Sequence, residues 1–356
     1  MTQNTKFWKN KKVFLTGHTG FKGGWLSVFL NHLGAEVLGF SLEAEPQSYF
    51  NLVNLEPILS HHVGDIRNLS ELVEAERNFK PDILIHMAAQ PLVLASYKDP
   101  ITTFSTNIMG TVNVLELVRM SSSIRSGVII TTDKCYENRN ISRGYKEDDP
   151  MGGYDPYSSS KGSAELIISS YQRSFFGKDQ YRKGTASVAS VRAGNVVGGG
   201  DWAKDRLIPD LLRSIEIKDK VKVRNPDATR PWQHVLEPLS GYLMVAEKLY
   251  KKGPSGSDCW NFGPKKKDIV TVSKVADMFC KAWGDKLSWS RDARTSYHEA
   301  HNLSLDITKA KKILDWIPKW SLSYAIDKTV EWHKAQMSGK NMLEMSVNQI
   351  KEFLKE

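Results

Sequence analysis

The chain has 356 residues, more than one compact domain usually holds, so we expect a large core with a smaller partner domain. Its hydrophobic and charged fractions, 40% and 25%, are those of a globular protein and exclude a disordered chain. The net charge of +9 is spread along the sequence, and its short basic clusters lack interleaved aromatic residues. We therefore expect a solvated basic surface and no nucleic-acid partner.

Three features indicate the compartment. No stretch approaches the roughly 20 apolar residues of a membrane span, so we expect no membrane partner. The first ten residues are polar and basic and do not resemble a secretory signal. Cys135, Cys259 and Cys280 are odd in number and far apart, which suits a reducing compartment and forms neither a disulfide framework nor a metal site. The sequence therefore predicts a cytoplasmic protein without a bound metal.

The first half of the chain alternates short apolar runs with helical patterns. The apolar runs predict strands at Lys12–Thr16, Glu36–Phe40, around His62–Val63, Asp82–His86, Gly127–Thr131 and Ala186–Val191. The stretches between them predict helices at Trp25–Leu33, Leu69–Phe79, Thr102–Met120 and Tyr157–Phe175. This alternation is typical of an α/β fold with a parallel, doubly wound sheet of the Rossmann type. We assign residues 1–195 to such a domain.

After about residue 196 the pattern changes. Glycines and prolines become frequent and the elements become shorter, which predicts a smaller mixed α/β domain for substrate binding over residues 196–340. Within it, the segment Val235–Tyr250 has a pattern that allows it to pack back on the first domain. Residues 341–356 keep apolar side chains at near-helical spacing, so we expect a helical tail that docks on the body or on a second subunit.

A glycine-rich loop, Gly17-His-Thr-Gly20-Phe-Lys-Gly23, joins the first strand to the first helix. Glycine permits the tight turn and the close approach of backbone to a pyrophosphate, and the helix N-terminus offers N–H groups to the anion. An ordinary turn can have the same composition, but the position between strand and helix favours a dinucleotide site. The residues expected to contact the cofactor here are Gly17, Thr19, Gly20, Phe21, Lys22 and Gly23.

The adenosine end of this site is less regular. Ser41 stands at the end of the second strand, where an acidic residue would bind the ribose, and Glu43 follows two positions later. No arginine is nearby to neutralise a 2′-phosphate, so NAD is favoured over NADP. Asp65, after the third strand, either faces the adenine edge or is a plain turn aspartate. The remaining residues of the expected NAD site follow the third and fourth strands and are Ile66, Ala88, Ala89 and Gln90.

Two side chains point to redox chemistry. Tyr157 and Lys161 are four residues apart, hence on one face of a helix. A free tyrosine has a pKa of about 10 and is a poor base near neutrality, but a lysine beside it stabilises the phenolate. Such a tyrosine can take a proton from a substrate hydroxyl. The pair is common by chance, but here it lies roughly 25 residues after the end of a strand at Thr131-Thr132, downstream of the glycine loop.

Together these motifs resemble the extended short-chain dehydrogenase/reductase superfamily over roughly Lys12 to Trp332. The resemblance implies that Thr132 orients a sugar and that Asn107, in the long helix, is a structural or water-holding partner at the cofactor site.

A narrower resemblance is to nucleotide-sugar 4,6-dehydratases, in which this threonine is followed by a proton-transfer dyad. Most of them have Asp-Glu, whereas this chain has Asp133-Lys134, as in the branch that acts on CDP-glucose. The other motifs similar to that branch are Gly17-His-Thr-Gly-Phe-Lys-Gly-Gly-Trp25, Val191-Arg-Ala-Gly-Asn195, Gly199-Gly-Asp-Trp202 and Arg230-Pro-Trp-Gln-His234.

The resemblance implies a reaction of deoxysugar synthesis with CDP-glucose as substrate. Carbon 4 is oxidised, water leaves across carbons 5 and 6, and the hydride returns to carbon 6, so bound NAD undergoes no net change. Tyr157, aided by Lys161, would take the proton of the carbon-4 hydroxyl, and Asp133 would protonate the departing carbon-6 hydroxyl. The base at carbon 5 is left open between Lys134 and Glu137.

Residues for the substrate itself are expected in the second half. Asn195 lies just past the last strand of the first domain, and arginine suits the diphosphate because it binds phosphate in bidentate fashion. Trp232 stacks on the base or sugar, or is a packed core residue. The polar segment before Leu303 lines the nucleotide pocket or is solvated. The expected substrate-binding residues are Asn195, Arg206, Arg230, Trp232, Arg294 and His298.

Three alternatives stay open. A nucleotide-sugar 4-epimerase would use the same tyrosine and lysine but would need no acid and base after the threonine, so Asp133-Lys134 argues against it. A reductase or alcohol dehydrogenase would consume free cofactor. A non-catalytic NAD-binding protein would have no need of Thr132, Tyr157 and Lys161. We also expect a homo-oligomer, either a dimer or a tetramer.

Overall fold

A computed structural model describes residues 5–179, 185–217, 220–284, 287–292 and 302–355. Its centre is a seven-stranded sheet in the order β11-β6-β5-β4-β1-β2-β3, and every neighbouring pair is parallel. The strands are β1 (Lys12–Thr16), β2 (Glu36–Ser41), β3 (Ser60–Val63), β4 (Ile83–His86), β5 (Ser126–Ile130), β6 (Ser187–Ala193) and β11 (Cys259–Phe262). The expected α/β fold of the Rossmann type is confirmed.

The apolar runs become central strands because both faces of the sheet are covered. In β1, every residue after Lys12 is buried, and Val13 pairs with Val37 of β2 on one side and Ile83 of β4 on the other. Strands buried on both faces are continuously apolar, as these are. The strand order reverses between β1 and β4, which opens a crevice at their carboxyl ends.

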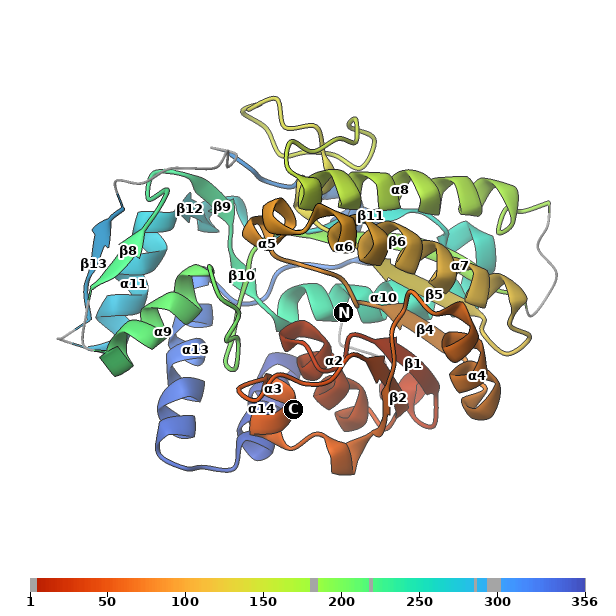
Figure 1. Ribbon diagram of the computed structural model, residues 1–356, viewed down its shortest axis with the longest axis horizontal. Helices are drawn as coiled ribbons and strands as arrows, with labels where there is room; N and C mark the ends of the chain where they lie inside the picture. Colours follow the sequence, from red (N-terminus) through yellow and green to blue (C-terminus); the bar gives the residue numbers. More distant parts are fainter. Residues whose placement is uncertain (1–4, 180–184, 218–219, 285–286, 293–301, 356) are drawn as a thin grey trace.

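Helices cover both faces of the sheet (Figure 1). On one face lie α4 (Leu69–Phe79), α5 (Val93–Lys98), α6 (Pro100–Phe104), α7 (Gly110–Met120) and α8 (Pro156–Ser174). The other face is covered by α1 (Thr5–Trp8), α2 (Phe21–His32), α3 (Tyr49–Val53), α10 (Leu236–Lys252), α12 (Thr308–Leu314) and α14 (Met342–Leu354). A separate cluster of buried apolar side chains fills each side.

Two predicted helices differ from the structure. The first begins at Phe21 instead of Trp25. Gly23 and Gly24, which were expected to precede the helix, lie inside it. A Cβ at Gly23 would come within 2.0 Å of the carbonyl oxygen of Gly17, and one at Gly24 within 2.4 Å of the Tyr49 ring. Packing therefore overrides the low helix propensity of glycine.

The long helix predicted at Thr102–Met120 is interrupted. It starts at Pro100 in α6, passes through a π-helical turn at Ser105–Met109, and continues as α7. A π-turn carries one extra residue and is common at functional sites. Here the π-turn contains Asn107, whose side chain forms hydrogen bonds with Gln90 and Ser160.

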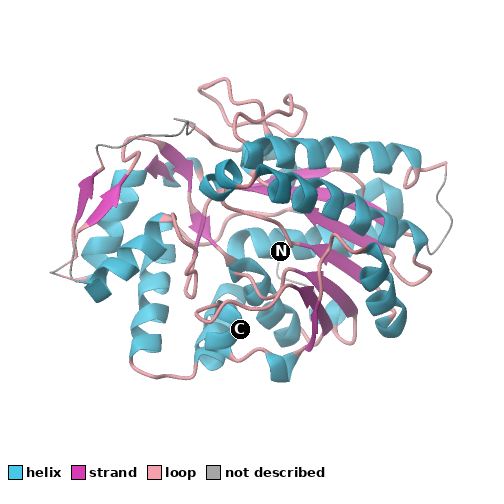
Figure 2. Ribbon diagram, viewed as in Figure 1, coloured by secondary structure: helices cyan, strands magenta, loops and turns pink. Residues whose placement is uncertain are grey.

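A smaller mixed α/β lobe stands beside the sheet, on the left in Figure 2. Its helices are α9 (Leu207–Ile217), α11 (Val272–Trp283) and α13 (Leu322–Met337). Its paired strands are β7 (Val196–Val197) with β10 (Gln233–His234), β8 (Val221–Val223) with β13 (Trp289–Arg291), and β9 (Thr229–Pro231) with β12 (Ile269–Thr271). A third apolar cluster fills this lobe. The short helical turns of the chain are η1 (Glu56–Ile58), η3 (Asp133–Cys135), η4 (Gly253–Gly256) and η5 (Lys266–Asp268).

The chain crosses between the two parts more than once. α10 packs on β5 and β6, and β11 adds the edge strand beside β6, so the large sheet draws on residues from both sides of position 196. The division at residue 196 stays a prediction. α14 docks on α2 and α13, where Ile350 and Phe353 are buried, so the tail packs on the body of its own chain. Among the described residues, no helix is long and apolar enough to cross a membrane.

Candidate active site

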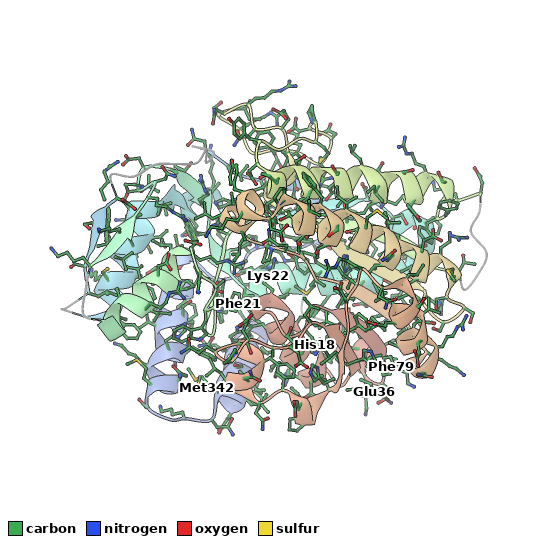
Figure 3. All side chains as sticks on the ribbon, viewed as in Figure 1. His18, Phe21, Lys22, Glu36, Phe79 and Met342 are labelled. Carbon is green, nitrogen blue, oxygen red and sulfur yellow. The ribbon has the colours of Figure 1, made fainter. Side chains whose placement is uncertain are left out.

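A cleft of about 1780 Å³ lies at the carboxyl ends of the sheet strands and extends along the smaller lobe. Ligand pockets commonly measure about 300–1,000 Å³, so this cleft has room for two ligands. Phe21 and Lys22, at the start of α2, lie near the centre of the molecule (Figure 3). The predicted site residues that line the cleft are Gly17, Thr19, Gly20, Phe21, Lys22, Gly23, Ser41, Asp65, Ile66, Ala88, Ala89, Gln90, Thr132, Asp133, Lys134, Glu137, Tyr157, Lys161, Asn195, Arg206, Arg230 and Trp232.

The three loop glycines have different reasons to be glycine. Gly17 has φ +80°, and a Cβ there would lie 2.6 Å from the backbone nitrogen of Ala88. Gly23 is excluded from carrying a Cβ by Gly17 itself. A Cβ at Gly20 would meet only the carbonyl oxygen of Gly17, at 3.4 Å, so packing does not require a glycine there. Gly20 caps α2 without a side-chain hydrogen bond and lines the cleft. It leaves the helix N-terminus open to a close anionic ligand.

Hydroxyl groups replace the expected acidic residue at the end of β2. The Thr19 hydroxyl lies 2.7 Å from that of Ser41 and 3.2 Å from the carbonyl oxygen of Leu42. Behind them, the rings of His18 and His61 are hydrogen-bonded at 2.7 Å, and burial together with the neighbouring His61 lowers the pKa of His18 to about 3. This histidine pair was not predicted, because His18 lies in the turn after β1 and His61 lies in β3, 43 residues further along the chain.

Asp65 has a partner that the sequence analysis missed. Its carboxylate accepts three hydrogen bonds from the Arg67 guanidinium, at 2.5–3.1 Å, and these lower its pKa. Arg67 also lines the cleft, so this corner presents an ion pair instead of a single carboxylate.

Asn107 lies behind the wall of the cleft. Its side chain accepts a hydrogen bond from the Gln90 backbone N–H (2.9 Å) and donates to the Gln90 carbonyl (3.0 Å) and to the Ser160 hydroxyl (2.9 Å). Asn107 therefore fixes the segment after β4, which lines the cleft, to helix α8. Asn107 was expected at the cofactor site as a structural or water-holding partner; it does not line the cleft itself, and its role stays a prediction.

The dyad segment forms a short helical turn directly after β5. Thr132 caps it, and its hydroxyl donates to Oδ1 of Asp133 at 3.1 Å. Asp133 is buried, and within the described residues its Oδ2 atom has no hydrogen-bond partner. Burial raises the pKa of Asp133 above its usual value, although Lys134 and Thr132 oppose this. A carboxyl group in this environment is suited to stay protonated and to act as an acid.

Tyr157 and Lys161 lie in the first turns of α8, facing the same cleft. Burial raises the pKa of Tyr157 to about 12, while a hydrogen bond with Thr132 and the charge of Arg206 act in the opposite direction. Burial lowers the pKa of Lys161 to about 8, and its ammonium donates to the carbonyl oxygen of Ile130 at 3.3 Å. The structure thus brings Thr132, Asp133 and Tyr157 together at one end of the cleft.

Lys22 reaches into this same end. Its amine donates to the Tyr242 hydroxyl of α10 at 3.0 Å, and burial with the nearby charges of Arg206 and Lys161 lowers its pKa to about 7. The partners are 220 residues apart in sequence, so the spacing of motifs could not have predicted this contact.

Beneath the end of β5 lies a buried ion pair between Glu165 of α8 and Arg192 of β6, with a shortest N–O distance of 2.7 Å. Glu165 also accepts hydrogen bonds from the hydroxyls of Thr131 and Ser190. Burial favours the neutral acid, but Arg192 and these donors hold the pKa of Glu165 below its usual value. The pair therefore links the end of β5, just before the dyad, to β6 and to helix α8.

We expect Glu165→Gln to destabilise the protein by about 3–5 kcal/mol, because it leaves the Arg192 charge buried and unpaired. The exposed pair of Arg291 and Asp227 supplies the control, since Asp227→Asn should cost less than about 1 kcal/mol. Denaturant unfolding of both variants measures the difference. Equal, small losses would show that the buried pair does not support the sheet.

Four of the six predicted substrate-binding residues line the cleft, and the other two lie outside the described residues. Arg206 forms an ion pair at 3.0 Å with Asp201, a residue of the motif Gly199-Gly-Asp-Trp202 that was not among the expected substrate-binding residues. The Arg230 guanidinium donates to the carbonyl oxygen of Thr229. Trp232 is only 5% exposed and packs in the core of the smaller lobe, while its edge lines the cleft. Arg294 and His298 lie outside the described residues.

The two candidate bases differ in exposure. Lys134 is half-buried in the cleft, whereas Glu137 is exposed at its edge. In the part of the chain that the structure describes, no cluster of histidine, cysteine and acidic side chains is able to hold a metal ion.

A family model described as GDP-mannose 4,6 dehydratase matches residues 14–329. This chain belongs to that family. The CDP-glucose 4,6-dehydratase of Salmonella typhimurium is 52% identical to it over 349 residues, covering 98% of this chain and 97% of the relative. The UDP-glucose 4-epimerase of Halalkalibacterium halodurans is 25% identical over 336 residues, covering 92% and 97%. The crystal structure of dTDP-glucose 4,6-dehydratase from Bacillus anthracis, in complex with NAD, matches with a TM-score of 0.75 at 21% identity, covering 94% and 99%.

Membership of the GDP-mannose 4,6 dehydratase family confirms the expected resemblance to nucleotide-sugar dehydratases and the assignment as an enzyme. It removes the alternative of a non-catalytic NAD-binding protein. Since an epimerase aligns over nearly the whole chain, extent of alignment does not separate the two reactions. The residues that distinguish a dehydratase from an epimerase are Asp133 and Lys134, which follow Thr132.

Proposed function

We propose that this chain is a CDP-glucose 4,6-dehydratase, which converts CDP-glucose to CDP-4-keto-6-deoxyglucose and water. The observation that carries the proposal is the buried carboxyl of Asp133, with a raised pKa, beside Thr132 and Tyr157 in one cleft. An epimerase needs no such acid. The 52% identity to a CDP-glucose 4,6-dehydratase supports the cytidine nucleotide.

The cofactor of this proposal is NAD. Gly20 leaves the N-terminus of α2 accessible, and the hydroxyls of Thr19 and Ser41 and the pair of Asp65 and Arg67 stand along the expected path of the adenosine. These residues fit a dinucleotide whose pyrophosphate lies on the helix N-terminus. When bound, NAD supplies the hydride acceptor for carbon 4 and the donor for carbon 6.

The chain's own residues handle the protons. Tyr157 accepts the proton of the carbon-4 hydroxyl, and this requires its pKa to fall from about 12. The Thr132 hydroxyl, beside Tyr157, forms a hydrogen bond with the sugar and so orients it. The ammonium of Lys161, on the same helical face, favours the phenolate.

Elimination follows because a ketone at carbon 4 acidifies the proton at carbon 5. Asp133 gives its proton to the carbon-6 hydroxyl as it leaves, and its burial keeps that proton available. Lys134 or Glu137 removes the carbon-5 proton and gives a proton back to carbon 5 when carbon 6 is reduced. Lys134 is the nearer to Asp133 in sequence and the more buried. We further propose that Arg206 and Arg230 hold the diphosphate and that Asn195 contacts the sugar.

Incubation with a panel of nucleotide-hexoses tests the proposal. CDP-glucose should give a product lighter by one water, seen by mass spectrometry, without accumulation of reduced nicotinamide. Preference for another nucleotide would replace the cytidine assignment. A product of unchanged mass but altered configuration at carbon 4 would make the chain an epimerase.

The pH profile offers a further test. An ammonium is charged below its pKa, so activity that depends on Lys161 should be present below about pH 8 and fall above it. Lys161→Arg remains charged throughout, so its lower activity should not fall over the same range. If the decline persists in Lys161→Arg, another group, such as Asp133 losing its proton, sets it.

We also propose that the protein is a cytoplasmic homo-oligomer. Cys135, Cys259 and Cys280 are all free, which suits a reducing compartment. Helices α6 and α8 lie side by side on the outer layer and expose Ile101 and Leu166, 81% and 62% accessible. A second copy of this chain is the occupant we assign to that surface. In sedimentation, the wild type should run as a dimer or tetramer and Leu166→Glu as a smaller species. A monomeric wild type would contradict the proposed oligomer, and an unchanged Leu166→Glu would contradict this surface.

A further inference from the structure

We propose that Tyr154 is a substrate-positioning residue whose ring packs against the hexose of the nucleotide sugar. The inference rests on the proposed function. Tyr154 lines the cleft and is 77% exposed, so its ring is accessible to a ligand bound there.

The backbone on the N-terminal side of Tyr154 is fixed to the dyad segment. Tyr136 and Met151 form an antiparallel bridge, and the Gly152 N–H donates to the carbonyl oxygen of Cys135 at 2.9 Å. A Cβ at Gly152 would come within 2.0 Å of the Glu137 carboxylate. The approach to Tyr154 is therefore tightly packed against the turn that carries Asp133.

The backbone on its C-terminal side is fixed to the catalytic helix. Gly153 has φ +137°, and a Cβ there would lie 2.4 Å from the backbone of Ser158. Asp155 is buried and caps α8, accepting hydrogen bonds from the backbone N–H (2.9 Å) and the hydroxyl (2.6 Å) of Ser158. Tyr154 thus stands between two anchored points, so its backbone is held at a set place on the cleft wall.

Chain length decides which part of the substrate it meets. Tyr154 and Tyr157 are three residues apart, so their Cα atoms are at most about 11 Å apart. Tyr157 must contact the carbon-4 hydroxyl, so the hexose is the part of the substrate within reach of Tyr154, and the nucleobase lies beyond two phosphates. An aromatic face suits the apolar C–H face of a pyranose, and covering it also removes water from the reacting carbons.

The test compares Tyr154→Ala with the matched control Tyr154→Phe in the holoenzyme. We expect Tyr154→Ala to lower kcat/KM for CDP-glucose by at least about tenfold, the equivalent of about 1.4 kcal/mol. Tyr154→Phe keeps the ring and should stay within about twofold of wild type. The inhibition constant of CDP, which has no hexose, should change by less than about twofold in both variants.

Other results would overturn the proposal in distinct ways. Equal losses in the Ala and Phe variants would mean that the hydroxyl, not the ring, makes the contact. Weaker CDP inhibition would place the ring on the nucleotide, and unchanged kinetics would leave it without a role. If the wild type prefers another nucleotide-hexose, the cytidine assignment fails separately, and that substrate with its own nucleoside diphosphate tests Tyr154 in the same way.

Discussion

Tyr157→Phe should lower the turnover of CDP-glucose by at least about 100-fold, the scale of a general acid–base group. The change removes one oxygen, the atom that takes the carbon-4 proton, and leaves the ring in place. The first step should be lost, so no reduced nicotinamide forms when substrate is added. Stopped-flow absorbance in a single turnover measures this directly.

Tyr171→Phe is the matched control. Tyr171 is on the same helix, but its hydroxyl donates to Glu116 and it does not line the cleft. Its loss should leave turnover within about twofold. Wild-type rates in Tyr157→Phe would remove this tyrosine from the chemistry.

Asp133→Asn should lower product formation by at least about 100-fold by a different route. The asparagine has the size of the acid but cannot expel the carbon-6 hydroxyl by giving up a proton. Oxidation at carbon 4 needs only Tyr157, Lys161 and Thr132, so it should survive. We expect the variant to stall after oxidation. It should then hold reduced nicotinamide, measured by absorbance, and a 4-keto-hexose that has not lost water, measured by mass spectrometry.

The same assay identifies the base. Lys134→Met should also stall, and in deuterated water it should exchange the carbon-5 proton slowly if the lysine is the base. Normal exchange in Lys134→Met, with slow exchange in Glu137→Gln, would assign the base to Glu137. Normal 6-deoxy product from both Asp133→Asn and Lys134→Met would contradict the dehydratase assignment.

Local patterns in the sequence predicted the architecture well because a strand buried on both faces is apolar along its whole length. The six predicted strands all belong to the large sheet. The seventh, β11, was not predicted, since its neighbour β6 ends more than 60 residues earlier and α10, which packs on β5 and β6, lies between them in the chain. The glycines inside α2 were misassigned for a related reason, as their neighbours are Gly17 and Tyr49 in space.

The candidate site shows the same division. Residues in short motifs, such as Thr132 with Asp133 and Gly17 with Gly20, line one cleft as expected. Their supporting contacts were not predictable, because the partners are chosen by the folded arrangement. Lys22 bonds to Tyr242, 220 residues away, and Asn107 bonds to Ser160, 53 residues away.

The central claim is an elimination made possible by transient oxidation at carbon 4. It is tested most directly with CDP-glucose that carries deuterium at carbon 4. The account predicts a 4-keto-6-deoxy product in which that deuterium is found at carbon 6, in each turnover and without added reductant. Deuterium that remains at carbon 4, or that is lost to the solvent, would contradict it.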